Sequence, residues 1–361
     1  MVNICRKLAM LAGVSTLVVG LSTAAHTETL NQALVSAYNN SGLLDQNRAV
    51  LRAADEDVAQ AMATLGPVVN WSATMRRQFS RGWAGDLFLG DTASTTASVG
   101  LDVSQVLYDG GRSALSVEQR KEAVLSSRQT LVSVEQAVLL NAVQAFMDVR
   151  RYAETVALRE NNLRVLKEEL RAAKDRFDVG EITKTDVALA EARLAASQSA
   201  LAAARGDLAQ AKEYYRQTVG KGAGQLDAPK SVPNLPKSAA TAKAMAVRNH
   251  PDIRKLQHDV TSAELGVQAA ASYREPRVTL GGEVEVVDQF RSDQSLLRGS
   301  VTLNASGPVY ASGRYPSLMR QAEHRKNATR SALLVAVRQI EQQAGSAYAI
   351  LDVARAGRSA S

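Results

Sequence analysis

Residues 113–179 read SALSVEQRKEAVLSSRQTLVSVEQAVLLNAVQAFMDVRRYAETVALRENNLRVLKEELRAAKDRFDV, and these 67 residues contain neither proline nor glycine. At about 1.5 Å per residue, an uninterrupted helix of this length extends for about 100 Å. A compact globular domain does not hold a helix of that length. The sequence therefore predicts a fold built around an extended helical rod.

Apolar residues recur along this stretch with the heptad spacing of a coiled coil. The first heptad position holds Leu131, Val138, Ala145, Tyr152, Arg159, Leu166 and Ala173. The second holds Glu135, Ala142, Val149, Val156, Leu163, Leu170 and Phe177. The two polar exceptions are Glu135 and Arg159. They could fix the register of the helices or mark a solvated face of the seam. We favour the interpretation that their aliphatic stems pack on the seam while their charged ends extend to solvent.

Gly180 interrupts the pattern, and a second heptad series follows it. This series consists of Val187, Leu194, Leu201, Leu208 and Tyr215, with Ala190, Ser197, Ala204 and Ala211 beside them. The small residues permit close approach of two helices. Residues 113–219 are therefore predicted to form a long antiparallel helical hairpin.

The chain repeats itself. Residues 37–69 align without gaps on residues 246–278, at an offset of 209. Residues 107–112 (LYDGGR) align on residues 309–314 (VYASGR) at an offset of 202, so the second copy lacks seven residues. We expect a first structural repeat over 26–220, a proline- and glycine-rich linker over 221–238, and a second repeat over 239–361.

Each repeat is predicted to contain a helix, two strands and a long helix. The first helix is expected from about residue 28 to 65, where Gly66 and Pro67 end it, and Pro276 takes the same place in the second copy. Period-two alternation predicts strands at about 67–79, 97–108, 276–288 and 298–309. The seven-residue loss is expected to shorten the loop of the second hairpin.

These strands could belong to a membrane protein or to a soluble one. Weakly alternating segments of about ten residues are typical of outer-membrane β-barrels, but a soluble four-stranded sheet packed on helices fits the alternation equally well. About eight strands are needed to close even a filled barrel. If the strands are transmembrane, several chains must share one barrel.

The first residues are typical of an export signal. Arg6 and Lys7 precede an apolar run from Leu8 to Leu21 and a small-residue segment ending at Ala25, so residues 1–25 are predicted to be a cleaved signal peptide. Cys5 would leave with it. No later run of 18 apolar residues occurs, and we expect no transmembrane helix in the mature chain.

Composition and motifs exclude several function classes. The four histidines lack metal-binding spacing, and the 43 basic residues form no block of the kind that binds nucleic acid. The pairs at Gly110 and Gly281 lack the GK[ST] of a phosphate loop. Asp186 has no motif-linked histidine or second carboxylate and is interpreted as a surface residue near a helix start. We therefore expect no enzyme activity, cofactor or metal.

Three sequence features together resemble the TolC-like outer-membrane efflux protein family. Residues 176–187 (RFDVGEITKTDV) are similar to the family's helix-turn-helix tip. The turns at 108–112 and 310–314 and the opening at Asn249 to Ile253 (NHPDI) are also similar to that family. The resemblance covers nearly the whole mature chain.

The resemblance implies an α+β membrane protein with a periplasmic α-barrel and four transmembrane strands per chain. Three chains would share a twelve-stranded β-barrel in contact with outer-membrane lipid, extending into the periplasm. The homotrimer would be a passive exit duct for efflux or type I secretion. Its partners would be a periplasmic adaptor protein and an inner-membrane ABC or RND-type transporter.

The resemblance also implies roles for particular residues. The adaptor-docking tip would comprise Val179, Gly180, Glu181, Thr183 and Asp186, with Gly180 giving the chain reversal. The strand-to-helix turns would comprise Tyr108, Gly110, Gly111, Arg112, Tyr310, Gly313 and Arg314. The helix-to-strand breaks would be Pro67 and Pro276.

The repeat further predicts that the chain is C-terminally truncated. At an offset of 202, the counterpart of Gly180 would fall near position 382, whereas the sequence ends at Ser361. The expectation is a second long helix that stops short of its tip. Two alternatives to a complete duct stay open, namely a non-channel periplasmic coiled-coil protein and a poorly functional channel fragment.

Overall fold

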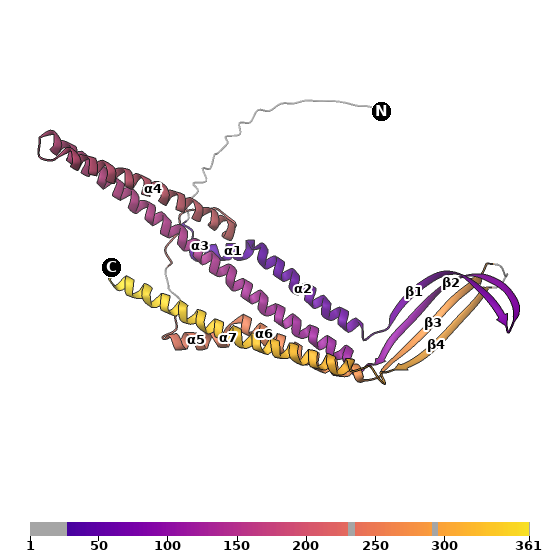
Figure 1. Ribbon diagram of the computed structural model, residues 1–361. Helices are drawn as coiled ribbons and strands as arrows, with labels where there is room; N and C mark the ends of the chain where they lie inside the picture. Colours follow the sequence, from indigo (N-terminus) through magenta and orange to yellow (C-terminus); the bar gives the residue numbers. More distant parts are fainter. Residues whose placement is uncertain (1–26, 230–234, 291–294, 361) are drawn as a thin grey trace, which may run out of the picture. The chain divides into compact units, whose positions relative to one another are not determined.

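The computed structural model describes residues 27–229, 235–290 and 295–360. The predicted signal peptide and its cleavage position after Ala25 lie outside the described residues. Two helices, two strands and two long helices follow one another, and then two helices, a 3-10 turn, two strands and a further long helix (Figure 1). The order of elements therefore repeats as far as the long helix that follows each strand pair.

The proline- and glycine-free stretch forms a single helix, α3 (Arg112–Asp178), of 67 residues. It ends in a glycine cap: Gly180 has φ +83°, and the amides of Gly180 and Glu181 donate to the carbonyls of Phe177 and Arg176, each at 2.9 Å. Helix α4 (Lys184–Val219) then runs back beside α3 (Figure 1). An ion pair of 2.7 Å between Arg205 and Glu160 links the two helices.

The chain divides into two compact units that cut across the sequence repeats. The described part of the first unit contains residues 27–37 and 142–229. Its core contains Phe146 and Tyr215, both fully buried, with ring centroids 6.5 Å apart. The other members are Ala33, Ala37, Ala142, Ala145, Val149, Ala211 and Val219. Small residues dominate this core because the helices approach closely at these positions.

The chain segment after α4 is fixed to the N-terminal end of this unit. Glu28 and Leu226 form a parallel bridge, in which the Glu28 amide donates to the Gln225 carbonyl at 2.7 Å. The Thr27 hydroxyl donates to the Asp227 carboxylate at 2.9 Å. Part of the predicted linker is therefore held by backbone hydrogen bonds.

The helix expected over residues 28–65 is wrong in one respect, because it is two helices. α1 (Leu30–Asn40) ends before Ser41, whose side chain caps α2 (Gly42–Ala63) by accepting from the Leu44 amide. The second copy has the same break between α5 (Ala239–Asn249) and α6 (Pro251–Ala271), where Pro251 begins the helix.

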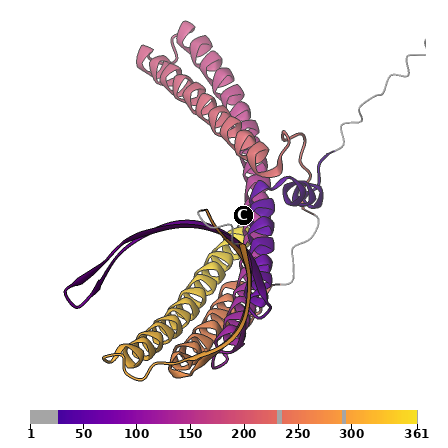
Figure 2. The same cartoon turned by 90° about the vertical axis from the view of Figure 1, so that its right-hand side faces the viewer.

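The second unit contains residues 38–141 and 235–360 of the described chain. α6 leads through a 3-10 turn (Ser272–Arg274) to the second strand pair, and α7 (Arg314–Ala360) then runs back beside α5 and α6 (Figures 1 and 2). Glu135 on α3 accepts a hydrogen bond of 2.9 Å from the Tyr38 hydroxyl. Our preferred interpretation, that Glu135 extends to solvent, is therefore wrong.

Four antiparallel strands form one sheet in the order β1-β2-β3-β4. They are β1 (Val68–Ala84), β2 (Leu87–Tyr108), β3 (Arg277–Gln289) and β4 (Ser295–Ser306). Figure 2 shows that the sheet is curved.

Two expectations for the strands are wrong. Residues 80–84 and 87–96, expected as loop, continue the first strand pair, with a turn at Gly85 (φ +62°). β1 and β2 have 17 and 22 residues against 13 and 12 for β3 and β4, so the length difference between the copies lies in the strands. β4 also ends at Ser306, earlier than the predicted residue 309.

Helix α3 contains an 18-residue window that is apolar enough to cross a membrane by length and composition. The expectation of no transmembrane helix used uninterrupted apolar runs, which this helix lacks. α3 contributes Ala142, Ala145, Phe146 and Val149 to the core of the first unit.

Candidate channel wall and helical tip

One face of the sheet is apolar and exposed across all four strands. The strand register places Trp71, Leu101 and Val284 in one row, and directly opposed residues lie on the same face. Trp71 is 75% exposed. The other large apolar residues of this face are Val69, Met75, Phe79, Val99, Val103, Leu280, Val286, Leu297, Val301 and Leu303. A continuous apolar face of this kind requires a nonaqueous partner.

The opposite face is largely polar. Asn70 donates to the Asp102 carboxylate at 3.0 Å, and Asp102 lies opposite Glu283 on the next strand. In the adjacent row, Arg298 donates to Glu285 at 3.2 Å. Alternation between an apolar and a polar face is the pattern of a barrel strand with lipid on one side and water on the other.

The hairpin end of β1 and β2 is aromatic and charged. The rings of Trp83 and Phe88 lie 5.1 Å apart, and Arg81 makes two hydrogen bonds to Asp91, at 2.6 and 2.8 Å. Aromatic residues and ion pairs beside an apolar band fit the boundary between lipid and water.

The first strand-to-helix turn is tightly packed against the second repeat. Gly110 and Gly111 have φ +68° and +78°. The Asp109 carboxylate accepts from the Ser113 amide at 3.0 Å, which caps α3. The Arg112 guanidinium lies 4.4 Å from the centre of the Tyr273 ring. This turn therefore joins β2 and α3 to the 3-10 turn that follows α6.

The second strand-to-helix turn has the same backbone course but is much more exposed. Gly313 has φ +81°, and Ser312, with φ +43°, is the one non-glycine residue with positive φ in the described chain. Tyr310 is 86% exposed, whereas Tyr108 is 48% exposed. Arg314 begins α7 as Arg112 begins α3. The structure therefore places the predicted turn residues in two equivalent turns, of which only the first is covered.

Pro67 and Pro276 lie at equivalent corners. Pro67 immediately precedes β1, and Pro276 immediately precedes β3. Proline fixes φ and has no amide hydrogen to donate, so neither residue can continue the preceding helix. A proline therefore marks both corners, the one between α2 and β1 and the one between the 3-10 turn and β3.

The helical tip has a reciprocal capping box. The Asp186 amide donates to the Thr183 hydroxyl at 3.4 Å, while the Thr183 amide and hydroxyl donate to the Asp186 carboxylate at 2.9 and 2.8 Å. The backbone hydrogen bond, followed by that of the hydroxyl, lowers the pKa of Asp186 below its usual range. Val179 is 71% exposed, and Glu181, Thr183 and Asp186 are exposed as well.

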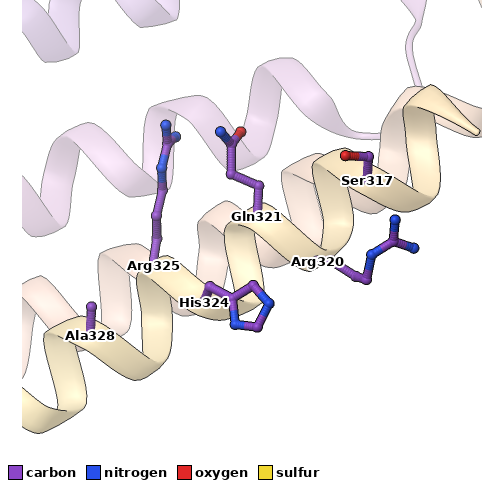
Figure 3. A pocket seen from close by; sticks show the side chains of 6 residues that line it. All are labelled: Ser317, Arg320, Gln321, His324, Arg325 and Ala328. Carbon is purple, nitrogen blue, oxygen red and sulfur yellow. The ribbon is translucent and has the colours of Figure 1, made fainter.

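A hollow of about 500 Å³ follows one face of α7 (Figure 3). Its lining residues are spaced by three and four positions and are all exposed. They are Ser317, Arg320, Gln321, His324, Arg325 and Ala328. Sequence reasoning missed this face. The repeat could have indicated it, because the aligned residues of α3 include Gln119, Glu122 and Ser126.

The chain is similar in sequence to outer-membrane efflux proteins. A family model described as "Outer membrane efflux protein" matches residues 11–221. The chain is 33% identical over 358 residues to the outer membrane efflux protein BepC of Brucella suis biovar 1 (strain 1330), covering 98% of this chain and 76% of that protein. The chain belongs to the outer membrane efflux protein family. This membership places it in the outer membrane and the periplasm.

More distant similarities agree with the family. Outer membrane protein TolC of Salmonella enteritidis is 23% identical over 349 residues, covering 91% of this chain and 68% of that one. The solved structure of CusC superposes with a TM-score of 0.77 at 17% identity, covering 92% of this chain and 77% of that one. That similarity shows a shared fold.

The family consists of channel proteins. In the described ranges, no group of three or more His, Cys, Asp and Glu side chains is arranged to hold a metal ion.

Proposed function

We propose that three copies of this chain form a passive exit duct of a tripartite efflux or type I secretion system. The two-faced sheet carries this proposal, because four strands with one apolar and one polar face cannot close a barrel alone. Three sheets supply twelve strands. The apolar face then meets lipid, and the polar face lines the water-filled bore.

The polar face fits a wall that solutes pass without being bound tightly. Asn70–Asp102 and Arg298–Glu285 pair polar side chains with one another across strands. Such pairing satisfies the side chains while leaving the surface wet. The inner-membrane transporter, of the ABC or RND type, would supply the energy.

The tip from Val179 to Asp186 is the proposed docking site for a periplasmic adaptor. It is exposed, and its conformation is fixed by the Gly180 cap and by the Thr183–Asp186 capping box. A rigid, solvent-exposed helical turn loses little conformational entropy on binding. The expected partner surface is a helical hairpin of the adaptor.

The test has two arms. The protein is extracted from outer membranes in mild detergent, its mass is measured by light scattering, and its conductance is measured in planar bilayers. A trimer that conducts supports the duct, whereas a soluble monomer in the periplasmic fraction contradicts it and favours the non-channel coiled-coil protein.

The tip is tested separately with Gly180→Val. A β-branched residue at φ +83° is strained, and no heavy atom lies within 4 Å of the added Cβ, so backbone conformation alone is perturbed. We expect a conducting trimer that no longer supports pump-dependent export. Gly206→Val, in the middle of α4 where the added Cβ also meets no atom within 4 Å, is the matched control. Unchanged export by Gly180→Val would remove the tip from the mechanism.

A further inference from the structure

The two repeats agree in the positions at which their elements begin and end. α1 and α5 begin and end 209 residues apart, and β1 and β3 begin at the same offset. α3 and α7 begin 202 residues apart. Each contact that joins the first repeat to the second within the chain therefore has a definite counterpart, in which a second-repeat residue would face a first-repeat residue.

Within the chain, α3 and β2 of the first repeat face α6 and β3 of the second. The Gln119 amide donates to the Ser262 carbonyl at 3.1 Å, and the Ser126 hydroxyl donates to Asp259 at 2.7 Å. Nδ1 of His258 lies 2.8 Å from Oε2 of Glu122. In the sheet, Asp102 is paired with Glu283.

The counterparts of these residues are exposed. Gln119, Glu122 and Ser126 correspond to Gln321, His324 and Ala328, which line the hollow on α7 (Figure 3). His258, Asp259 and Ser262 correspond to Ala49, Val50 and Ala53, which lie on an exposed face of α2. Val50 is 55% exposed. The same chain therefore presents both halves of an interface, uncovered.

We propose that the hollow on α7, the turn at Tyr310–Arg314 and the edge of β4 receive α2, the Gly66 corner and the edge of β1 from a neighbouring copy, in the register set by the internal contacts. The proposal rests on the proposed trimer and specifies how its copies join.

Substitutions at the corners support this pairing. Within the chain, Gly110 lies against Glu275, where an added Cβ would come within 2.5 Å of the Glu275 Cβ. The counterparts are Ser312 and Gly66. The glycine has changed sides: each corner pairs one glycine with one larger residue, and the larger residue is Glu275 inside the chain and Ser312 between chains. Gly66 has room for a side chain within its own chain, because the nearest atom to an added Cβ is 3.6 Å away.

The helix contact also differs between the two junctions. The polar pair Ser126 and Asp259 has the apolar counterparts Ala328 and Val50, and the pair Glu122 and His258 has the counterparts His324 and Ala49. Gln119 and Gln321 are identical, and the acceptor of Gln119 is a backbone carbonyl, which does not depend on the partner's side chain. Gln321 therefore donates to the Ala53 carbonyl of the neighbouring copy.

The strand register follows from the same correspondence. Asp102 and Glu283 map to Asn304 and Thr74, so Asn304 of one copy lies opposite Thr74 of the next and Leu303 lies opposite Met75. This register keeps polar residues beside polar residues and apolar residues beside apolar ones. A slip by one residue would place Leu303 on the polar face of the sheet. The separation into an apolar and a polar face therefore disfavours that register.

Disulfide trapping in outer membranes tests the register. Directly opposed cysteines on paired strands form disulfides readily. Thr74→Cys with Asn304→Cys should give covalent dimers and trimers on non-reducing gels, and neither single variant should. The slipped pairs Ser72→Cys with Asn304→Cys and Arg76→Cys with Asn304→Cys should cross-link at least tenfold more slowly. Asp102→Cys with Glu283→Cys is the matched control, because it should close a disulfide within one chain.

The outcomes separate this inference from the trimer itself. The register is contradicted if light scattering shows a trimer but Thr74→Cys with Asn304→Cys forms no disulfide, or if a slipped pair cross-links faster. The proposal of a trimeric duct would then still stand. An intrachain Asp102–Glu283 disulfide in a protein that forms no trimer overturns both.

The corner is tested by restoring the internal arrangement between copies. Gly66→Glu should reduce the trimer yield about tenfold because it overpacks the corner between copies. Adding Ser312→Gly should recover the trimer, because the new pair then matches Glu275 and Gly110. Absence of a defect in Gly66→Glu, or of recovery in the double variant, contradicts the pairing of these corners.

Discussion

The two adjacent glycines of the first strand-to-helix turn provide a matched pair for testing how that turn is held. Gly110 and Gly111 both have left-handed backbone angles, φ +68° and +78°. A Cβ added to Gly110 would lie 2.5 Å from the Glu275 Cβ and 2.7 Å from its Cγ, whereas a Cβ added to Gly111 meets no atom within 4 Å. Alanine at either position thus has the same backbone cost, and only one position has a steric clash.

The magnitudes follow from these two effects. Left-handed backbone costs an alanine roughly 1–2 kcal/mol. Carbon atoms in contact prefer about 3.5–4.0 Å, so Gly110→Ala also forces the Glu275 corner to move by about 1 Å. Overpacking of this kind adds about 1–3 kcal/mol. We expect Gly110→Ala to destabilise the turn by about 2–5 kcal/mol and Gly111→Ala by about 1–2 kcal/mol.

The assay is thermal unfolding of the detergent-solubilised protein, followed by circular dichroism. Gly110→Ala should lower the midpoint temperature by several degrees more than Gly111→Ala. Glu275→Gly combined with Gly110→Ala should bring the midpoint back to that of Glu275→Gly with Gly111→Ala. Equal midpoints for the two single alanine variants would show that the clash does not determine the packing of this turn.

Four further predictions concern the core, the wall, the seam and the tip. Phe146→Ala should reduce the opening free energy of the helical hairpin by about 3–5 kcal/mol, measured by hydrogen exchange in α3 and α4; unchanged protection would contradict a core at Phe146 and Tyr215. Trp71→Arg should lower outer-membrane assembly because it places a charge against lipid at a cost of about 2–4 kcal/mol, while Ser72→Arg, on the polar face, should assemble normally in the same heat-modifiability gel. Leu163→Asp should weaken trimer assembly by several kcal/mol because it places an unpaired charge in the half-buried heptad seam, with Leu158→Asp, at an exposed position, as the control on native gels. Because hydrogen bonds lower the pKa of Asp186 in the folded tip, its stabilisation is complete above the unfolded value of about 3.9 and is lost as pH falls through the folded value; tip protection measured across this range should depend on pH in the natural chain and not in Asp186→Asn.

The helical rod was predictable because its signal is local. Helix α3 runs from Arg112 to Asp178, and the sequence between Ser113 and Val179 has no residue that breaks a helix. The reversal at Gly180 follows from the need for positive φ at one position. Capping and helix breaking involve only a few neighbouring residues, so helix ends can be predicted without knowing which segments pack against the helix.

Strand ends were less predictable because pairing decides them. Residues 92–98 (TASTTAS) have no strong apolar alternation, yet they belong to β2 because β1 pairs with them throughout. At the other end, Tyr108 is in β2 through its pairing with Val278, whereas the equivalent Tyr310 has no strand beside it in the described chain. Similar local sequences thus give a strand where a neighbour supplies the hydrogen bonds and an irregular segment where none does.

The differences between the two copies carry information that neither copy shows alone. Ser41 precedes Gly42, a weak helix breaker, and its counterpart His250 precedes Pro251, a strong one; both positions separate two helices. In the same way, Gly110 and Ser312 both have positive φ, but only Gly110 has a glutamate, Glu275, packed against it, and the counterpart of Glu275 is Gly66. A duplicated chain that must close a ring meets two kinds of junction, one inside the chain and one between chains. Residues that differ between the copies at corresponding junction positions are therefore where contacts between copies are specified, and alignment of the chain with itself is the way to find them.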